Sequence, residues 1–167
     1  MENASKALLM AAGVLIGMMV LSLMVYLFVS FGSTSREIRE EQAQKQLNQF
    51  NTQFTSYMGT TNTIYDVVTI ANLATRNNID YELEYRGTVA TGNDNYISVY
   101  LDDDAFPRNL RGFIERGYND RGSKNYDDII RAGLADLKPD GSLPEYTCDV
   151  GISSTTQRVY WVKFKRK

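Results

Sequence analysis

The sequence contains no histidine and a single cysteine, Cys148. Without histidine the chain lacks the commonest general base and the commonest transition-metal ligand, which excludes a Ser-His-Asp triad and a His-ligated zinc site. One cysteine cannot form an intrachain disulfide or a Cys-based zinc site. We expect Cys148 to lie in a strand as a small apolar residue, with an intermolecular bridge or a reactive thiol as the alternatives.

Charged residues are absent from residues 7–35, and residues 8–31 are almost wholly apolar. A helix of about 25 such residues rises roughly 37 Å, which is enough to cross a hydrocarbon core of about 30 Å. An isolated apolar segment crosses lipid only as a helix, because its backbone must satisfy its own hydrogen bonds. We therefore interpret residues 1–33 as a single-pass anchor in contact with membrane lipid. A cleaved secretory signal is the alternative, and the length of the apolar run argues against it.

Two glycines, Gly13 and Gly17, stand four residues apart inside the apolar run. A Gly-x-x-x-Gly pair lets two membrane helices approach closely. We predict that these glycines mark a helix-packing face through which the chains form homo- or hetero-oligomers. The alternative is the ordinary use of glycine in membrane helices.

Residues 34–59 predict an amphipathic stalk helix. Gly32 indicates a helix break or a flexible joint before it, and Thr34 with Glu37 matches a capping box that would start a second helix. An apolar stripe then recurs at helical spacing. We regard its members as candidates for a partner interface, with packing against the domain's own sheet as the alternative; they are Leu47, Phe50, Phe54 and Tyr57.

Residues 60–167 predict one α+β domain with a small, mainly antiparallel sheet. The domain is long enough for one core of modest size. In chain order we expect a helix from residue 62 that stops at Asn77-Asn78, a hairpin of 81–85 and 96–101 joined by a turn at 92–95, a short helix at 110–118, a helix at 126–137, and strands at 146–152 and 158–165.

Two of these elements carry detailed expectations. In the helix at 126–137, we expect the acidic pair in the first turn to cap the helix and the apolar residues Ile129, Ile130, Leu134 and Leu137 to be buried. In the last strand, alternation predicts a buried face made of Tyr160, Val162 and Phe164.

The charge of the whole chain excludes some functions. A net charge of −2 gives no strong attraction to nucleic acid, so we expect no nucleic-acid partner. The basic residues Lys163, Lys165, Arg166 and Lys167 are expected to form a solvated chain end, with contact to anionic lipid or to a partner as the alternative.

Three adjacent carboxylates, Asp102, Asp103 and Asp104, could hold a hard cation such as calcium. Adjacent residues on an extended chain point to opposite sides, and the spacing of an EF-hand loop is absent. We therefore expect a solvated turn with helix capping at this point, no metal site and no cofactor.

A long apolar N-terminal helix that leads into an amphipathic helix and a small antiparallel sheet resembles a type IV pilin or a type II secretion pseudopilin. The resemblance implies N-terminal helices bundled into a filament core, with the sheet domain outside and extracytoplasmic. By the count of lysine and arginine near the anchor, Lys6 against Arg36, Arg39 and Lys45, the domain would instead lie inside. The chain also resembles small bacterial single-anchor proteins through Phe50-Asn51, Phe54, Tyr57 and Gly59.

Two functions are therefore expected. The first is a structural or assembly subunit of a cell-envelope filament or secretion apparatus, as the resemblance implies. The second is a membrane-tethered binding module that presents its sheet domain to a partner. No catalytic signature is present in the sequence, so we do not expect an enzyme.

Overall fold

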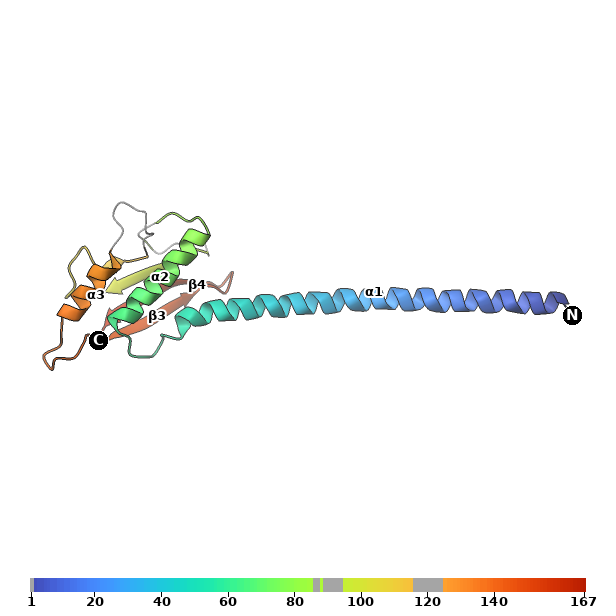
Figure 1. Cartoon of the computed structure of the whole chain (residues 1–167), viewed down its shortest axis with the longest axis horizontal. Helices are drawn as coiled ribbons and strands as arrows, with labels where there is room; N and C mark the ends of the chain where they lie inside the picture. Colours follow the sequence, from blue (N-terminus) through green and yellow to red (C-terminus); the bar gives the residue numbers. More distant parts are fainter. Residues whose placement is uncertain (1, 86–87, 89–94, 116–124) are drawn as a thin grey trace. The chain divides into compact units, whose positions relative to one another are not determined.

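The structure is a computed structural model that describes residues 2–85, 88, 95–115 and 125–167. The chain divides into two compact units, Met1–Gln46 and Leu47–Lys167. Its elements, coloured along the chain in Figure 1, are α1 (Glu2–Thr55), α2 (Ile64–Asp80), β1 (Ser98–Asp102), β2 (Gly112–Phe113), α3 (Tyr126–Ala135), β3 (Tyr146–Ile152) and β4 (Val159–Arg166).

The first unit is made of helix α1 alone. The helix runs through residues 32–35 without interruption, so the break expected at Gly32 and the new helix expected at Thr34 are both wrong. The hydroxyls of Ser33 and Thr34 donate to the carbonyl of Ser30 at 2.9 and 3.0 Å, a bonding pattern that satisfies them within a helix. Among the described residues, α1 is the one helix long and apolar enough to cross a membrane.

The second unit contains a mixed sheet of four strands in the order β2-β1-β4-β3. Strand β1 pairs antiparallel with β2 and parallel with β4, and β3 pairs antiparallel with β4. The expected α+β class is therefore confirmed, but the sheet is mixed because its two central strands are parallel. One face of the sheet contributes to the core through Val99, Leu101, Cys148, Val162 and Phe164.

Helices α2 and α3 bury that face, and Figure 1 shows α2 crossing in front of the strands. A capping box starts α2, in which the Thr63 backbone N–H donates to the Asp66 carboxylate at 2.7 Å. On α3, Gly133 lies against Ile64, since a Cβ at this glycine would be 2.5 Å from the Ile64 side chain. The absence of a side chain at Gly133 therefore lets the two helices approach closely.

The hairpin expected from residues 81–85 and 96–101 is not formed, because residues 81–85 are a turn and irregular chain. Helix α2 continues past Asn77 to Asp80. The Asn78 side chain accepts from the Ile97 N–H at 2.8 Å and donates to the Ile97 carbonyl at 2.9 Å. A helix side chain thus pairs with the backbone just before β1, where the sequence predicted a strand. The expected turn at 92–94 lies outside the described residues.

The short helix expected at 110–118 is also wrong over residues 110–115, the part of this range that the structure describes. Gly112 and Phe113 form β2, and the Ile114 N–H donates to the Val99 carbonyl at 2.9 Å. The spacing of Leu110, Phe113 and Ile114 resembles a helical face, but it arises from a short edge strand and its flanks. Residues 116–118 lie outside the described residues.

The remaining helix and strands were predicted closely. Strand β3 has the expected bounds, and β4 begins one residue later than expected. Tyr160 is half-buried and Val159 is buried instead, because the pairing shifts register between Gly151 and Ile152. In α3, Ile129 is buried but Leu134 is 36% exposed. Leu137 follows the end of α3 at Ala135 and is 52% exposed, so the predicted buried stripe is wrong in its second half.

Candidate functional site

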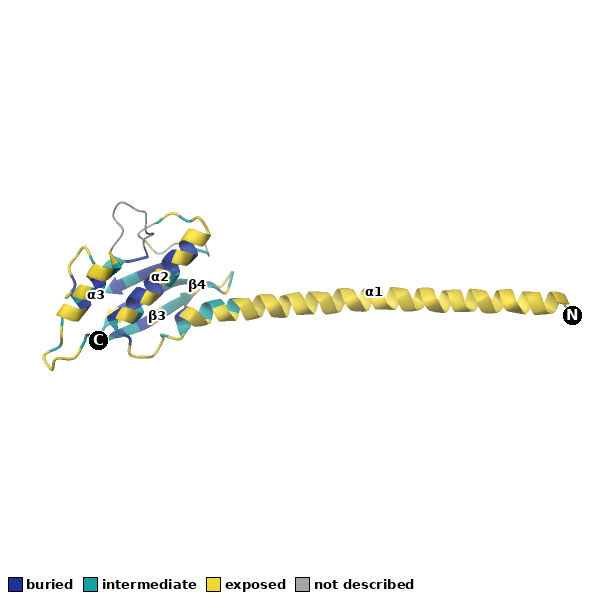
Figure 2. Ribbon diagram, viewed as in Figure 1, coloured by how far each residue is buried: buried dark blue, intermediate teal, exposed yellow. Residues whose placement is uncertain are grey.

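Every described residue of the first unit is exposed, as the yellow ribbon of α1 in Figure 2 shows. Its apolar residues include large side chains such as Leu9, Met19 and Phe28, which are 72–79% exposed. A Cβ placed at Gly13 or Gly17 would meet no other atom within 4 Å, so neither glycine is required by a close contact within the chain. A large exposed apolar surface is typical of segments that contact a membrane or another protein, and by length and composition this helix could cross a membrane.

The apolar stripe at the end of α1 lies in the second unit and is largely used inside the domain. Phe54 is 1% exposed and belongs to the core, and Phe50 and Tyr57 pack against that core. Leu47 is half-buried. This arrangement corresponds to the alternative in which the stripe packs against the domain's own sheet, and it leaves Phe54 inaccessible to a partner while the domain is folded.

Two polar side chains hold the last turns of α1 in the second unit. The Asn51 amide donates to the Gln157 carbonyl at 2.6 Å and accepts from the Val159 N–H at 3.0 Å. The Arg158 guanidinium lies 3.9 Å from the centre of the Phe50 ring and donates to Asn77 at 3.1 Å. The Phe50-Asn51 pair, noted in the sequence only by resemblance, thus joins α1 to the start of β4.

The three adjacent carboxylates do not form the expected solvated turn. Asp103 is buried and accepts hydrogen bonds from the Tyr146 hydroxyl at 2.9 Å and from the Ala105 N–H at 3.0 Å. Asp102 and Asp104 point to other partners, Lys163 at 2.9 Å and Arg111 at 2.6 Å. The carboxylates therefore diverge, and the described residues contain no cluster of three or more potential His, Cys, Asp or Glu ligands for a metal ion.

The basic residues at the end of the chain are mostly paired. Arg166 bridges Asp136 and Asp103, Lys163 pairs with Asp102, and the Lys167 ammonium donates to the Thr61 hydroxyl at 2.9 Å. These bonds raise the pKa of Arg166, chiefly through Asp136, and that of Lys163, chiefly through Asp102. The solvated basic end expected from the sequence is therefore reduced mainly to Lys165, which is exposed.

The single cysteine is a core residue, as expected. Cys148 lies in β3 and is 3% exposed. Burial raises the pKa of its thiol to about 12, so it is protonated near neutral pH. A buried, protonated thiol is a poor nucleophile and packs as a small apolar group.

A buried carboxylate, Glu115, was missed in the sequence. It is 1% exposed, accepts from the Val99 N–H at 2.9 Å and from the Tyr96 hydroxyl at 3.2 Å, and has its pKa raised mainly by burial. The Tyr126 hydroxyl lies nearby on α3 and donates to the Ile114 carbonyl at 3.1 Å. Val99 lies in β1 and Tyr96 lies two residues before it, so the two hydrogen bonds that Glu115 accepts help to fix the start of that strand.

Glu115→Gln is expected to raise the unfolding temperature at pH 7 by about 2–5 °C. Because the folded-state pKa of Glu115 is raised, the folded state retains this proton more strongly than the unfolded state. Stability therefore falls as the pH rises from the unfolded-state pKa through the folded-state pKa. Glutamine keeps an oxygen for the Val99 N–H and removes the buried charge.

Thermal unfolding of the full chain in detergent between pH 4 and pH 8, followed by Trp161 fluorescence, measures this effect. The advantage of Glu115→Gln should shrink toward pH 4. Glu84→Gln, at an exposed glutamate, is the control and should unfold like the native chain. An advantage that does not vary with pH, or a loss at every pH, would contradict the assignment.

The sheet face opposite the helices brings together a second group of side chains that the sequence did not connect. The register places Tyr100 opposite Phe113 on one side and Lys163 on the other, and the Tyr100 and Phe113 rings contact edge to face at 5.1 Å. Lys163 lies 5.6 Å from the centre of the Tyr100 ring. We call this surface the open face; it includes Tyr100, Asp102, Phe113, Asp149, Trp161, Lys163 and Lys165. Ser98, in register with Trp161 on the same side of the sheet, is buried and donates to the Thr88 carbonyl at 3.1 Å, so the face is covered at that end.

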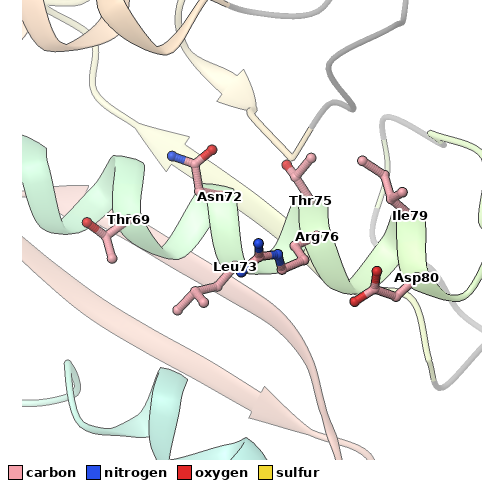
Figure 3. Close-up of a pocket in the computed structure, with 7 residues that line it drawn as sticks. All are labelled: Thr69, Asn72, Leu73, Thr75, Arg76, Ile79 and Asp80. Carbon is pink, nitrogen blue, oxygen red and sulfur yellow. The ribbon is translucent and has the colours of Figure 1, made fainter.

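Helix α2 also borders a hollow of about 570 Å³ on its outer side. Figure 3 shows its lining residues along one helix, with Asn72 and Thr75 pointing away from Leu73. Arg76 and Asp80 place one charge of each sign at the hollow. The lining side chains drawn in Figure 3 do not converge on a common point.

Comparisons with protein-family models, with curated proteins and with solved structures found no match. The functional argument therefore rests on the apolar helix of the first unit and on the open face of the second.

Proposed function

We propose that this chain is a single-pass membrane protein that works as a structural or assembly subunit of a cell-envelope filament or secretion apparatus. The α+β domain is extracytoplasmic in this proposal. The observation that supports it is the apolar run of α1, of which every residue is exposed in the folded chain. Such a helix is stable when lipid or neighbouring helices surround it, and both surroundings are available to a membrane assembly subunit.

Gly13 and Gly17 give the helix a place where a second helix can approach. They lie four residues apart, one turn of the helix, and no close contact within the chain requires either of them. In lipid, close backbone approach allows the van der Waals contacts that drive helix association. We infer that homo- or hetero-oligomers form through this part of α1.

The second candidate is a membrane-tethered binding module. Two observations favour it: the stripe of α1 is used inside the domain, and the open face presents aromatic and charged side chains. In this function the anchor fixes the domain at the membrane and the open face binds the partner. The two candidates differ in whether the anchor itself is an interface.

The double variant Gly13→Ile, Gly17→Ile is expected to weaken self-association of the full chain in a membrane two-hybrid assay. Isoleucine at these positions keeps the helix apolar but separates the two backbones. Leu23→Ile, an exchange of similar size elsewhere in the helix, is the matched control and should keep the native signal. A native signal from the double variant at equal expression would favour the tethered binding module.

A further inference from the structure

The open face has a charge pattern that is complementary to itself. On the two central strands, Tyr100 pairs in register with Lys163, and Asp102 pairs with Lys165. The acid is therefore on β1 and the base is on β4 at the same height. Lys165 is exposed, and Asp102 already contacts Lys163 at 2.9 Å.

A two-fold axis parallel to the strands and between β1 and β4 would place β1 of one copy over β4 of another. The axis preserves height along the strands, so Asp102 of each copy would lie over Lys165 of the other. By the same operation Tyr100 would lie over Lys163 of the other copy, the pairing of ring and ammonium that already occurs within the chain at 5.6 Å. Both contacts occur twice in such an isologous interface.

We propose that the open face is a homodimer interface, in which the sheets of two copies pack face to face about this axis. Packed sheets lie about 10 Å apart with their strands within about 30° of each other, which brings side chains of the two faces into contact. The aromatic residues Tyr100, Phe113 and Trp161 supply the apolar contact, and the paired charges set the register.

The proposed dimer rests on the proposed function in one respect: both copies must be anchored in the same membrane. Two anchored chains have a high effective concentration, so a small interface can be occupied without high intrinsic affinity. The charges on the face balance, with Asp102 and Asp149 against Lys163 and Lys165. This balance favours a second copy over a polyanion such as nucleic acid.

Crosslinking of the full chain in native membranes tests the geometry. Two differently tagged chains are co-expressed in a Cys148→Ala background, one with Lys165→Cys and the other with Asp102→Cys, and treated with a short bismaleimide. We expect a product that carries both tags. The control pair replaces Asp102→Cys by Arg131→Cys, at an exposed residue of α3 on the helix side, and should give no such product.

Charge exchange tests the pairing. In the Gly13→Ile, Gly17→Ile background, we expect full chains with the native face to keep a residual signal in the membrane two-hybrid assay, because both copies stay anchored in one membrane. Copies that all carry Asp102→Lys, or all carry Lys165→Glu, should lose this signal, because like charges then face each other. A mixture of the two variants should regain it, since each contact again joins opposite charges. Arg131→Glu is the control and should leave the signal unchanged.

The outcomes separate this proposal from the proposed function. Absence of the doubly tagged product, with a two-hybrid signal that still depends on Gly13 and Gly17, would overturn the dimer face and leave helix association intact. Absence of both would overturn both. Because Asp102→Lys also faces Lys163 within its own chain, its folding is checked by Trp161 fluorescence; if it unfolds, the crosslinking result alone decides.

Discussion

Phe54→Ala is expected to lower the free energy of unfolding of the second unit by about 3–5 kcal/mol. Phe54 is 1% exposed and packs in the same core as residues of α2, α3 and the sheet. Its ring centre lies 5.4 Å from that of Phe50, an aromatic contact that the substitution also removes. Alanine leaves a cavity that the surrounding core can fill only in part.

Urea unfolding of the full chain in mild detergent, followed by Trp161 fluorescence, measures this loss. Trp161 is the only tryptophan of the chain and lies in β4, so its signal reports the second unit alone. Leu47→Ala is the matched control: it removes an apolar side chain from the same stripe at a half-buried position, and should cost less than about 1.5 kcal/mol. Equal, small effects would mean that Phe54 is not a core residue.

This comparison bears on what periodicity can predict. The spacing of Leu47, Phe50 and Phe54 correctly indicated one apolar face of a helix. Tyr57 lies in the turn that follows, because α1 ends at Thr55 and not at residue 59 as expected. It could not say whether a sheet of the same chain or another subunit covers that face, because both bury the same atoms. The choice depends on contacts between residues far apart in sequence, such as those of Asn51 with Gln157 and Val159.

Elements with strong local patterns were predicted well. Helices α2 and α3 have clear helical spacing, and β3 and β4 have β-rich sequences between turn residues, so these four elements were found with small errors at their ends. The failures lie where a distant partner decides the structure. Residues 81–85 alternate like a strand, but the Asn78 side chain pairs with the backbone at Ile97 before β1. The parallel pairing of β1 with β4 joins segments about 60 residues apart, which no local pattern reports.

The open face was partly readable from the sequence. Tyr100 and Asp102 alternate with the buried residues of β1, and Trp161, Lys163 and Lys165 alternate with those of β4, so both sets were assignable to the side away from the core. The register between β1 and β4 was not assignable. Since the register places Asp102 beside Lys165, the self-complementary charge pattern became visible only in the structure.

Buried polar residues were the hardest to anticipate. Asp103 stands between two other aspartates in a sequence that is typical of a solvated turn, yet its side chain is fully buried. Three donors from separate parts of the domain make this burial possible: the Tyr146 hydroxyl of β3, the Ala105 N–H, and Arg166 of β4 at 3.5 Å. Buried charge is tolerated where it is paired and hydrogen-bonded, and only the folded chain brings these donors together.

Asp103→Ala is therefore expected to lower the free energy of unfolding by about 3–5 kcal/mol. The substitution removes one of the acceptors of Arg166 and the carboxylate to which the buried Tyr146 hydroxyl donates. Tyr146→Phe removes a single donor and should cost about 1–2 kcal/mol. The double variant should cost clearly less than the sum, since it removes the hydroxyl that the first substitution leaves unpaired. Urea unfolding of the four chains, followed by Trp161 fluorescence, gives this coupling. Additive costs, or a loss below about 1 kcal/mol for Asp103→Ala, would show that the carboxylate is not the centre of a buried network.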